Sequence, residues 1–121
     1  MELTGSRRPP MRRRPSVLSR SKVNRMIEEA TVDAYGDEEQ ATGFLTMIQN
    51  HVPCPCTALV VGEPVQVVGF DFGEPYETTV MAVCRRKGKR HKINVTSLEW
   101  DGKPPKGAEW VDAYRAWLRG A

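Results

Sequence analysis

Cysteine is scarce in this sequence, and long apolar runs are missing from it. The three cysteines are Cys54, Cys56 and Cys84. This odd number, without a secretory context, argues against a disulfide framework and predicts a reducing, cytoplasmic compartment. No apolar run approaches the ~20 residues that a membrane-spanning helix needs. The Arg-rich beginning is not followed by an apolar segment, so we expect neither a signal peptide nor a membrane partner.

The sequence also lacks the patterns that accompany common catalytic chemistry. It contains no Gly-rich loop that would cradle a phosphate. Neither His51 nor His91 has a convincing catalytic partner nearby in the sequence. We therefore expect a protein that is not an enzyme, although a catalytic triad formed only in space would escape this argument.

Positive charge is concentrated at the beginning of the chain. Residues 1–25 carry eight basic residues and one acidic residue, whereas the remainder carries ten basic and fourteen acidic residues. Residues 1–22 also contain three prolines and few residues to bury, so burial cannot offset the entropy of ordering them. The sequence predicts a disordered basic arm over residues 1–22 and a single domain over residues 23–121.

Such an arm has two open interpretations. Basic arms often bind nucleic acid or anionic protein surfaces, and the candidate contacts here are Arg12, Arg13 and Arg14. The alternative is a solubilising extension, or a true start at Met11 or Met26.

The apolar spacing predicts three helices and several short strands. The helices are expected over residues 21–34, 37–50 and 110–118. The strands are expected over residues 57–61, 65–70, 77–86 and 89–95, with a short edge strand within 96–100. The pattern predicts an α+β fold in which two N-terminal helices precede a small SH3-like antiparallel β-barrel and a C-terminal helix.

Two acidic clusters are candidate sites for a hard divalent cation, which prefers six to eight oxygen ligands. The first surrounds the turn between the two N-terminal helices and contains Asp33, Asp37, Glu38 and Glu39. The second follows the second strand and contains Asp71, Glu74 and Glu77. We expect the two clusters to meet and share calcium. The alternative for the first is that acids in the first turn of a helix only complement its dipole.

Two further groups of residues have competing interpretations. Cysteines 54, 56 and 84, with the two histidines, could hold zinc, although a Cys-x-Cys pair is not the usual zinc spacing. A strongly basic hairpin tip could bind phosphates or could simply be a solvated turn. Its candidate residues are Arg85, Arg86, Lys87, Lys89 and Arg90. Together with the arm, this tip supports an alternative function as an accessory subunit of a ribonucleoprotein or another large assembly, with a protein or RNA partner.

Several segments resemble a bacterial family of small calcium-binding proteins, best known from a very acidic protein of heterocyst-forming cyanobacteria. The segments are residues 32–44 (VDAYGDEEQATGF), 53–58 (PCPCTA), 61–69 (VGEPVQVVG) and the aromatic helix 110–120. The resemblance covers residues 24–121. It implies helices packed on an SH3-like barrel and a non-enzymatic calcium buffer or sensor that uses surface carboxylates. It places Asp33, Asp37, Glu38 and Glu39 in the acidic signature, and Asp71, Glu74 and Glu77 in the family's acidic connection.

Overall fold

The computed structural model describes residues 19–73 and 78–120. Within them the elements follow one another as α1 (Arg20–Thr31), α2 (Asp37–His51), β1 (Cys56–Val60), β2 (Glu63–Phe72), β3 (Val80–Arg86), β4 (Lys89–Asn94), the 3₁₀ helix η2 (Val95–Ser97) and α3 (Glu109–Leu118). The α+β fold predicted from the sequence is confirmed.

The two N-terminal helices differ at their ends from the prediction. Helix α1 begins at Arg20, where the Ser19 side chain caps it by accepting from the Lys22 N–H at 3.1 Å. It ends at Thr31 rather than at residue 34, and Asp33 then takes a left-handed φ of 59°.

The sequence at the start of α2 has a capping-box pattern, with Asp37 as the cap and Gln40 three residues later, but the structure does not form it. Asp37 is the first helical residue, not the cap, and Gly36 holds the cap position at a φ of 96°. The side chain that reaches back past the cap is that of Glu39, three residues after Gly36. Its carboxylate accepts from the Tyr35 N–H at 2.8 Å.

The four strands form one antiparallel sheet in the order β1-β2-β3-β4. The register between β2 and β3 shifts between Val67 and Gly69, which marks an irregularity of the bulge type. The strand predicted over 77–86 begins only at Val80, since residues 78 and 79 are not part of it, and Glu77 lies outside the described residues.

After η2 the chain returns to the free edge of β1. Leu59 and Glu99 exchange two backbone hydrogen bonds of 2.7 and 2.9 Å there. The edge strand predicted within 96–100 is therefore reduced to η2 and this single bridge. The bridge turns the sheet toward closure, as a small barrel requires.

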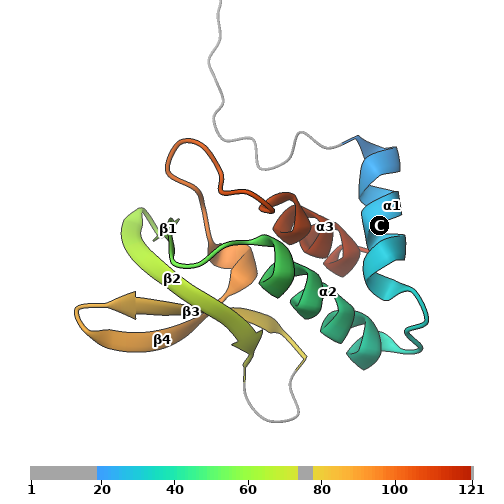
Figure 1. Cartoon of the computed structure of the whole chain (residues 1–121), viewed down its shortest axis with the longest axis horizontal. Helices are drawn as coiled ribbons and strands as arrows, with labels where there is room; N and C mark the ends of the chain where they lie inside the picture. The colour runs from blue at the N-terminus through green and yellow to red at the C-terminus, as the bar shows by residue number, and fades with distance from the viewer. Residues whose placement is uncertain (1–18, 74–77, 121) are drawn as a thin grey trace, which may run out of the picture.

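The three helices lie together on one side of the sheet (Figure 1). Phe44 and Ile48 of α2 and Tyr114 of α3 are buried in the core between these layers. Helix α1 approaches α2 closely at Gly43, where a Cβ atom would lie only 1.9 Å from the Ala30 carbonyl oxygen. Among the described residues, no helix has the length and apolar character needed to cross a membrane.

Candidate metal centre

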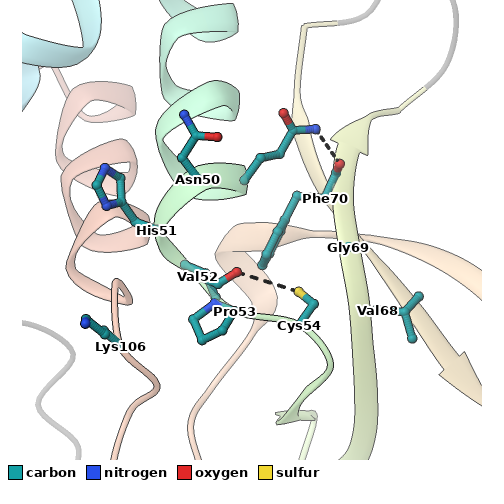
Figure 2. Close-up of a pocket in the computed structure, with 10 residues that line it drawn as sticks. Asn50, His51, Val52, Pro53, Cys54, Val68, Gly69, Phe70 and Lys106 are labelled. Carbon is teal, nitrogen blue, oxygen red and sulfur yellow. Dashed lines mark hydrogen bonds between the residues drawn. The ribbon is translucent and has the colours of Figure 1, made fainter.

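The carboxyl end of β2 is held against helix α2. The Gln49 side-chain N–H donates to the Phe70 carbonyl oxygen at 2.9 Å, the bond drawn as a dashed line beside Phe70 in Figure 2. Phe70 itself is buried in the core. Phe70 is therefore held twice, through its backbone carbonyl by α2 and through its side chain by the core, just before β2 ends.

The start of β3 is held in a comparable way by α3. The buried hydroxyl of Tyr114 accepts from the Val80 N–H at 3.1 Å. Because buried backbone donors need a partner, this contact specifies where β3 begins. The segment between β2 and β3 thus starts and finishes at anchored positions.

Three oxygen-bearing groups converge at the end of β2 on the ammonium of Lys92. We call them the β2-end oxygen cluster: the Asp71 carboxylate and the carbonyl oxygens of Phe72 and Gly73. The Lys92 Nζ donates to the Phe72 carbonyl at 2.8 Å and to the Gly73 carbonyl at 3.1 Å. The Asp71 Oδ2 lies 3.8 Å from the same Nζ. The cluster already surrounds a positive charge.

The chemistry of this cluster suits calcium. Carboxylate and backbone carbonyl oxygens are the donors that hard divalent cations take. The Asp71 side chain is 62% exposed, and its Oδ1 accepts from the Phe72 N–H at 2.8 Å, which orients the carboxylate beside the carbonyls. Further oxygens are needed to reach six or more, and Glu74 and Glu77, which follow directly, lie outside the described residues.

The first acidic cluster lies at the beginning of α2, whereas the hydrogen bond that ties α2 to β2 lies near the other end of the helix. Asp33, Asp37, Glu38 and Glu39 are all exposed. Residue Gln49, which contacts the end of β2, follows Glu38 by eleven helical positions, and at 1.5 Å per residue this separates them by about 17 Å. Within the described ranges, no three acidic, histidine or cysteine residues form a group that could hold a metal. Shared ligation by both clusters therefore stays a prediction that depends on Glu74 and Glu77.

A pocket of about 610 Å³ opens where α2 ends, between that end and β2. Its lining residues come from 49–54 and 68–70 together with Lys106 (Figure 2). None of them carries a carboxylate, and the His51 ring is stacked on Trp110 with a centroid distance of 5.5 Å. The lining of this pocket therefore offers calcium no negatively charged oxygen ligand.

The thiols are free but protonated at neutral pH. Burial, and next the neighbouring Cys54, raise the pKa of Cys56 to about 11, and burial raises the pKa of Cys84. A thiolate is the form that ligates zinc or attacks an electrophile. The lack of a three-residue ligand group in the described part of the chain argues against the zinc alternative.

The basic tip lies on the β3–β4 hairpin. Its residues Arg85, Arg86, Lys87, Lys89 and Arg90 are all exposed. Arg86 pairs with Glu63 of β2. The arm residues Arg12, Arg13 and Arg14 lie outside the described residues.

Sequence reasoning missed the role of Lys92 and of the two carbonyl oxygens. In the sequence Lys92 closely follows the residues of the basic tip, and nothing local distinguishes it from them. The signal that separates it is the alternation of side chains along β4, which points Lys92 to the same face as Asp71 once the register is known. Backbone ligands leave no mark in a sequence.

Two solved structures are similar to this chain. One is described as the crystal structure of Anabaena CcbP, whose sequence is 18% identical. The match covers 85% of this chain and 94% of that chain, with a TM-score of 0.70. A structure titled as a calcium-binding protein in the calcium-binding form is 19% identical and covers 83% of this chain and 92% of its own, with a TM-score of 0.66. At these identities the likeness establishes the fold. No curated protein sequence matches the chain.

A family model described as calcium binding matches residues 24–118, which is most of the chain and extends from within α1 to the last residue of α3. The family is characterised by calcium binding rather than by a reaction. The extent of this match, together with the shared fold, makes the chain a member of the calcium-binding CcbP family.

Proposed function

We propose that this protein binds calcium at the end of β2 and functions without catalysing a reaction. The observation that supports this location is the β2-end oxygen cluster. Two carbonyl oxygens lie 2.8 and 3.1 Å from the Lys92 ammonium nitrogen, and a carboxylate oxygen lies 3.8 Å from it. Membership of a calcium-binding family supplies the identity of the ion.

Glu74 and Glu77 are the natural candidates to complete the coordination. They follow Asp71 in the same connection, and each carboxylate can contribute one or two oxygens. In this proposal Asp71 and two carbonyls supply the first three ligands, and the two glutamates supply the rest.

The acids of the α1–α2 turn have a secondary role in this proposal. Asp37, Glu38 and Glu39 occupy the first turn of α2, where negative charge stabilises a helix by roughly 0.3–1 kcal/mol per residue. Glu39 is already engaged with the Tyr35 N–H. With Asp33 they supply a second, weaker set of carboxylates for calcium.

Calorimetric titration of calcium into the full chain tests the location. In Asp71→Asn the carboxylate is replaced by a neutral amide of the same shape, and we expect the affinity to fall by about tenfold or more. Asp37→Asn makes the same charge change at the other cluster and should stay within about threefold of wild type. A loss of calcium affinity confined to Asp37→Asn would place the calcium site at the turn between α1 and α2 and contradict the proposed location.

Calcium should also stabilise the protein if it binds the folded state. At a free concentration one hundred times the dissociation constant, the free energy of unfolding should rise by about 2.7 kcal/mol. A wild-type protein that shows neither heat nor a higher melting temperature at millimolar calcium would contradict the proposed function.

Between the two forms of calcium function, the contacts favour a buffer over a sensor. A sensor must rearrange on binding to expose a new surface, whereas a buffer changes little. Here the flanks of the site are tied to α2 by Gln49 and to α3 by Tyr114. Near-ultraviolet circular dichroism that hardly changes with calcium would agree with this. The three free thiols fit the reducing cytoplasm in which we place the protein.

The basic tip supports a second candidate function, binding to RNA within a larger assembly. Five exposed cationic side chains on one hairpin, with the arm, could contact phosphates. Fluorescence anisotropy with a labelled single-stranded RNA tests this by comparing the full chain with Arg85→Ser/Arg90→Ser. Affinity that falls in the variant and with rising salt is expected, and salt-independent binding would contradict it.

A further inference from the structure

We propose that Lys92 is a built-in competitor of calcium, whose ammonium occupies the β2-end oxygen cluster and must leave before the ion can bind. This inference rests on the calcium function proposed above. It assigns to one residue of β4 the control of affinity at that site.

The position of Lys92 follows from the register of the sheet. Asp71 of β2 pairs with Met81 of β3, which pairs with Asn94 of β4. Lys92 is two residues before Asn94 and therefore points to the same face as Asp71. From that position its long side chain reaches across the sheet to the last residues of β2.

The contacts of the ammonium are those that a small cation would make. Its nitrogen donates to two carbonyl oxygens, of Phe72 and Gly73, and lies 3.8 Å from the carboxylate of Asp71. Lysine donates up to three hydrogen bonds and accepts none, so its head requires oxygen neighbours of this kind. Calcium and the ammonium therefore need the same oxygens and cannot use them together.

Competition of this kind has two physical components. The ammonium must give up its hydrogen bonds to the two carbonyls when the ion enters. A bound divalent ion would also repel a positive charge held about 4 Å away. The side chain is 40% exposed, so it has room to swing into solvent when it is displaced.

The test compares calcium affinity in the full chain and in Lys92→Met, which keeps an unbranched side chain without the charge. We expect the dissociation constant to fall by about tenfold or more, because the internal competitor and its repulsion are both removed. Lys89→Met is the matched control, since it removes the same charge from an exposed position on the same strand. Titrations at about 150 mM salt screen general electrostatics, so the control should stay within about threefold of wild type.

Nitrogen NMR of the lysine ammonium groups in the wild-type chain gives a second readout. The signal of Lys92 is assigned as the one missing from Lys92→Arg. We expect it to be present without calcium and to shift with the same midpoint as the calorimetric titration, as the ammonium moves from carbonyl oxygens to water. This measurement stands even if Lys92→Met does not fold.

The outcomes separate this inference from the function on which it rests. If the wild-type chain binds calcium and Lys92→Met binds it equally well, the competitor role is overturned and the calcium function stands. Equal tightening in Lys89→Met and Lys92→Met would also overturn it, because only net charge would then matter. A Lys92 signal that stays unchanged through a complete calcium titration would do the same. If neither the wild type nor Lys92→Met binds calcium, both proposals fail.

Discussion

Single hydrogen bonds at the flanks of the candidate site determine how its oxygens are presented. On the β2 side, the bond from Gln49 holds the Phe70 carbonyl; on the β3 side, Tyr114 holds the Val80 N–H. Both bonds join segments far apart in the sequence. At this scale the site is an arrangement of backbone groups that distant side chains keep in place.

Removing the Tyr114 hydroxyl tests the second of these bonds. In Tyr114→Phe the ring remains packed against Phe44, but the buried Val80 N–H loses its acceptor. We expect the free energy of unfolding to fall by about 1–3 kcal/mol. Urea denaturation measures the loss, and an unchanged midpoint would show that the bond contributes nothing to stability.

A half-buried carboxylate on α3 makes stability depend on pH. Burial raises the pKa of Asp112 above its ordinary value of 3.8, and Arg115, at 3.1 Å, opposes that shift. The folded state therefore holds a proton at pH values where the unfolded state has lost it. The stability contributed by this proton is complete below the ordinary pKa and is lost as pH rises through the folded-state pKa.

Asp112→Asn removes this titration. The stability of the wild type relative to the variant should be greatest in acid and should decrease as the pH rises, measured by urea denaturation from about pH 3 to about pH 7. Asp101→Asn alters an exposed carboxylate and is the control. A difference that instead grows with pH would mean that attraction to Arg115 outweighs burial.

At the scale of elements, close contacts between helices place α2 against β2. Gly43 lets α1 lie directly on α2. The ring of Phe44, at the next position, packs at a tilt against the rings of Tyr114 and Trp117 of α3, with 5.6 and 5.3 Å between ring centres. Arg115 joins α3 to the segment after β4 through the carbonyls of Thr96 and Leu98 at 3.2 and 2.7 Å. The helices therefore form one support for both flanks of the site.

Gly43→Ala tests that support. Its Cβ would meet the Ala30 carbonyl at 1.9 Å, so α1 must shift, and we expect a loss of about 1–3 kcal/mol in the free energy of unfolding despite the better helix propensity of alanine. Thr46→Ala, at an exposed position of the same helix, should change stability by less than about 0.5 kcal/mol. Equal stability of Gly43→Ala and wild type would contradict the close contact.

At the scale of the whole molecule, the fold was largely predictable from the sequence. Apolar spacing at Ala41, Phe44 and Ile48 predicts α2, and the basic turn at Lys87 and Gly88 predicts the β3–β4 hairpin, because both signals are local. The early end of α1 was missed, since it depends on the left-handed backbone of Asp33 rather than on apolar spacing.

The site was only partly predictable, for a different physical reason. The sequence shows carboxylates, so Asp71 was identified as a candidate ligand. It does not show carbonyl oxygens, and it could not show that Lys92 crosses the sheet to reach them. Nor could it show that the acids beginning α2 are separated by most of a helix from this contact with β2, because only the structure shows that Gln49 makes the contact.

The most direct test of the central claim is the position of calcium-induced change in a two-dimensional amide NMR titration of the full chain. If the ion binds the carbonyls of Phe72 and Gly73, the largest shifts should fall on amides next to those carbonyls, with smaller changes along β4 near Lys92. The dissociation constant fitted to these shifts should agree with the one measured by calorimetry. Shifts confined to the turn between α1 and α2, or no shifts at millimolar calcium, would contradict a calcium site at the end of β2.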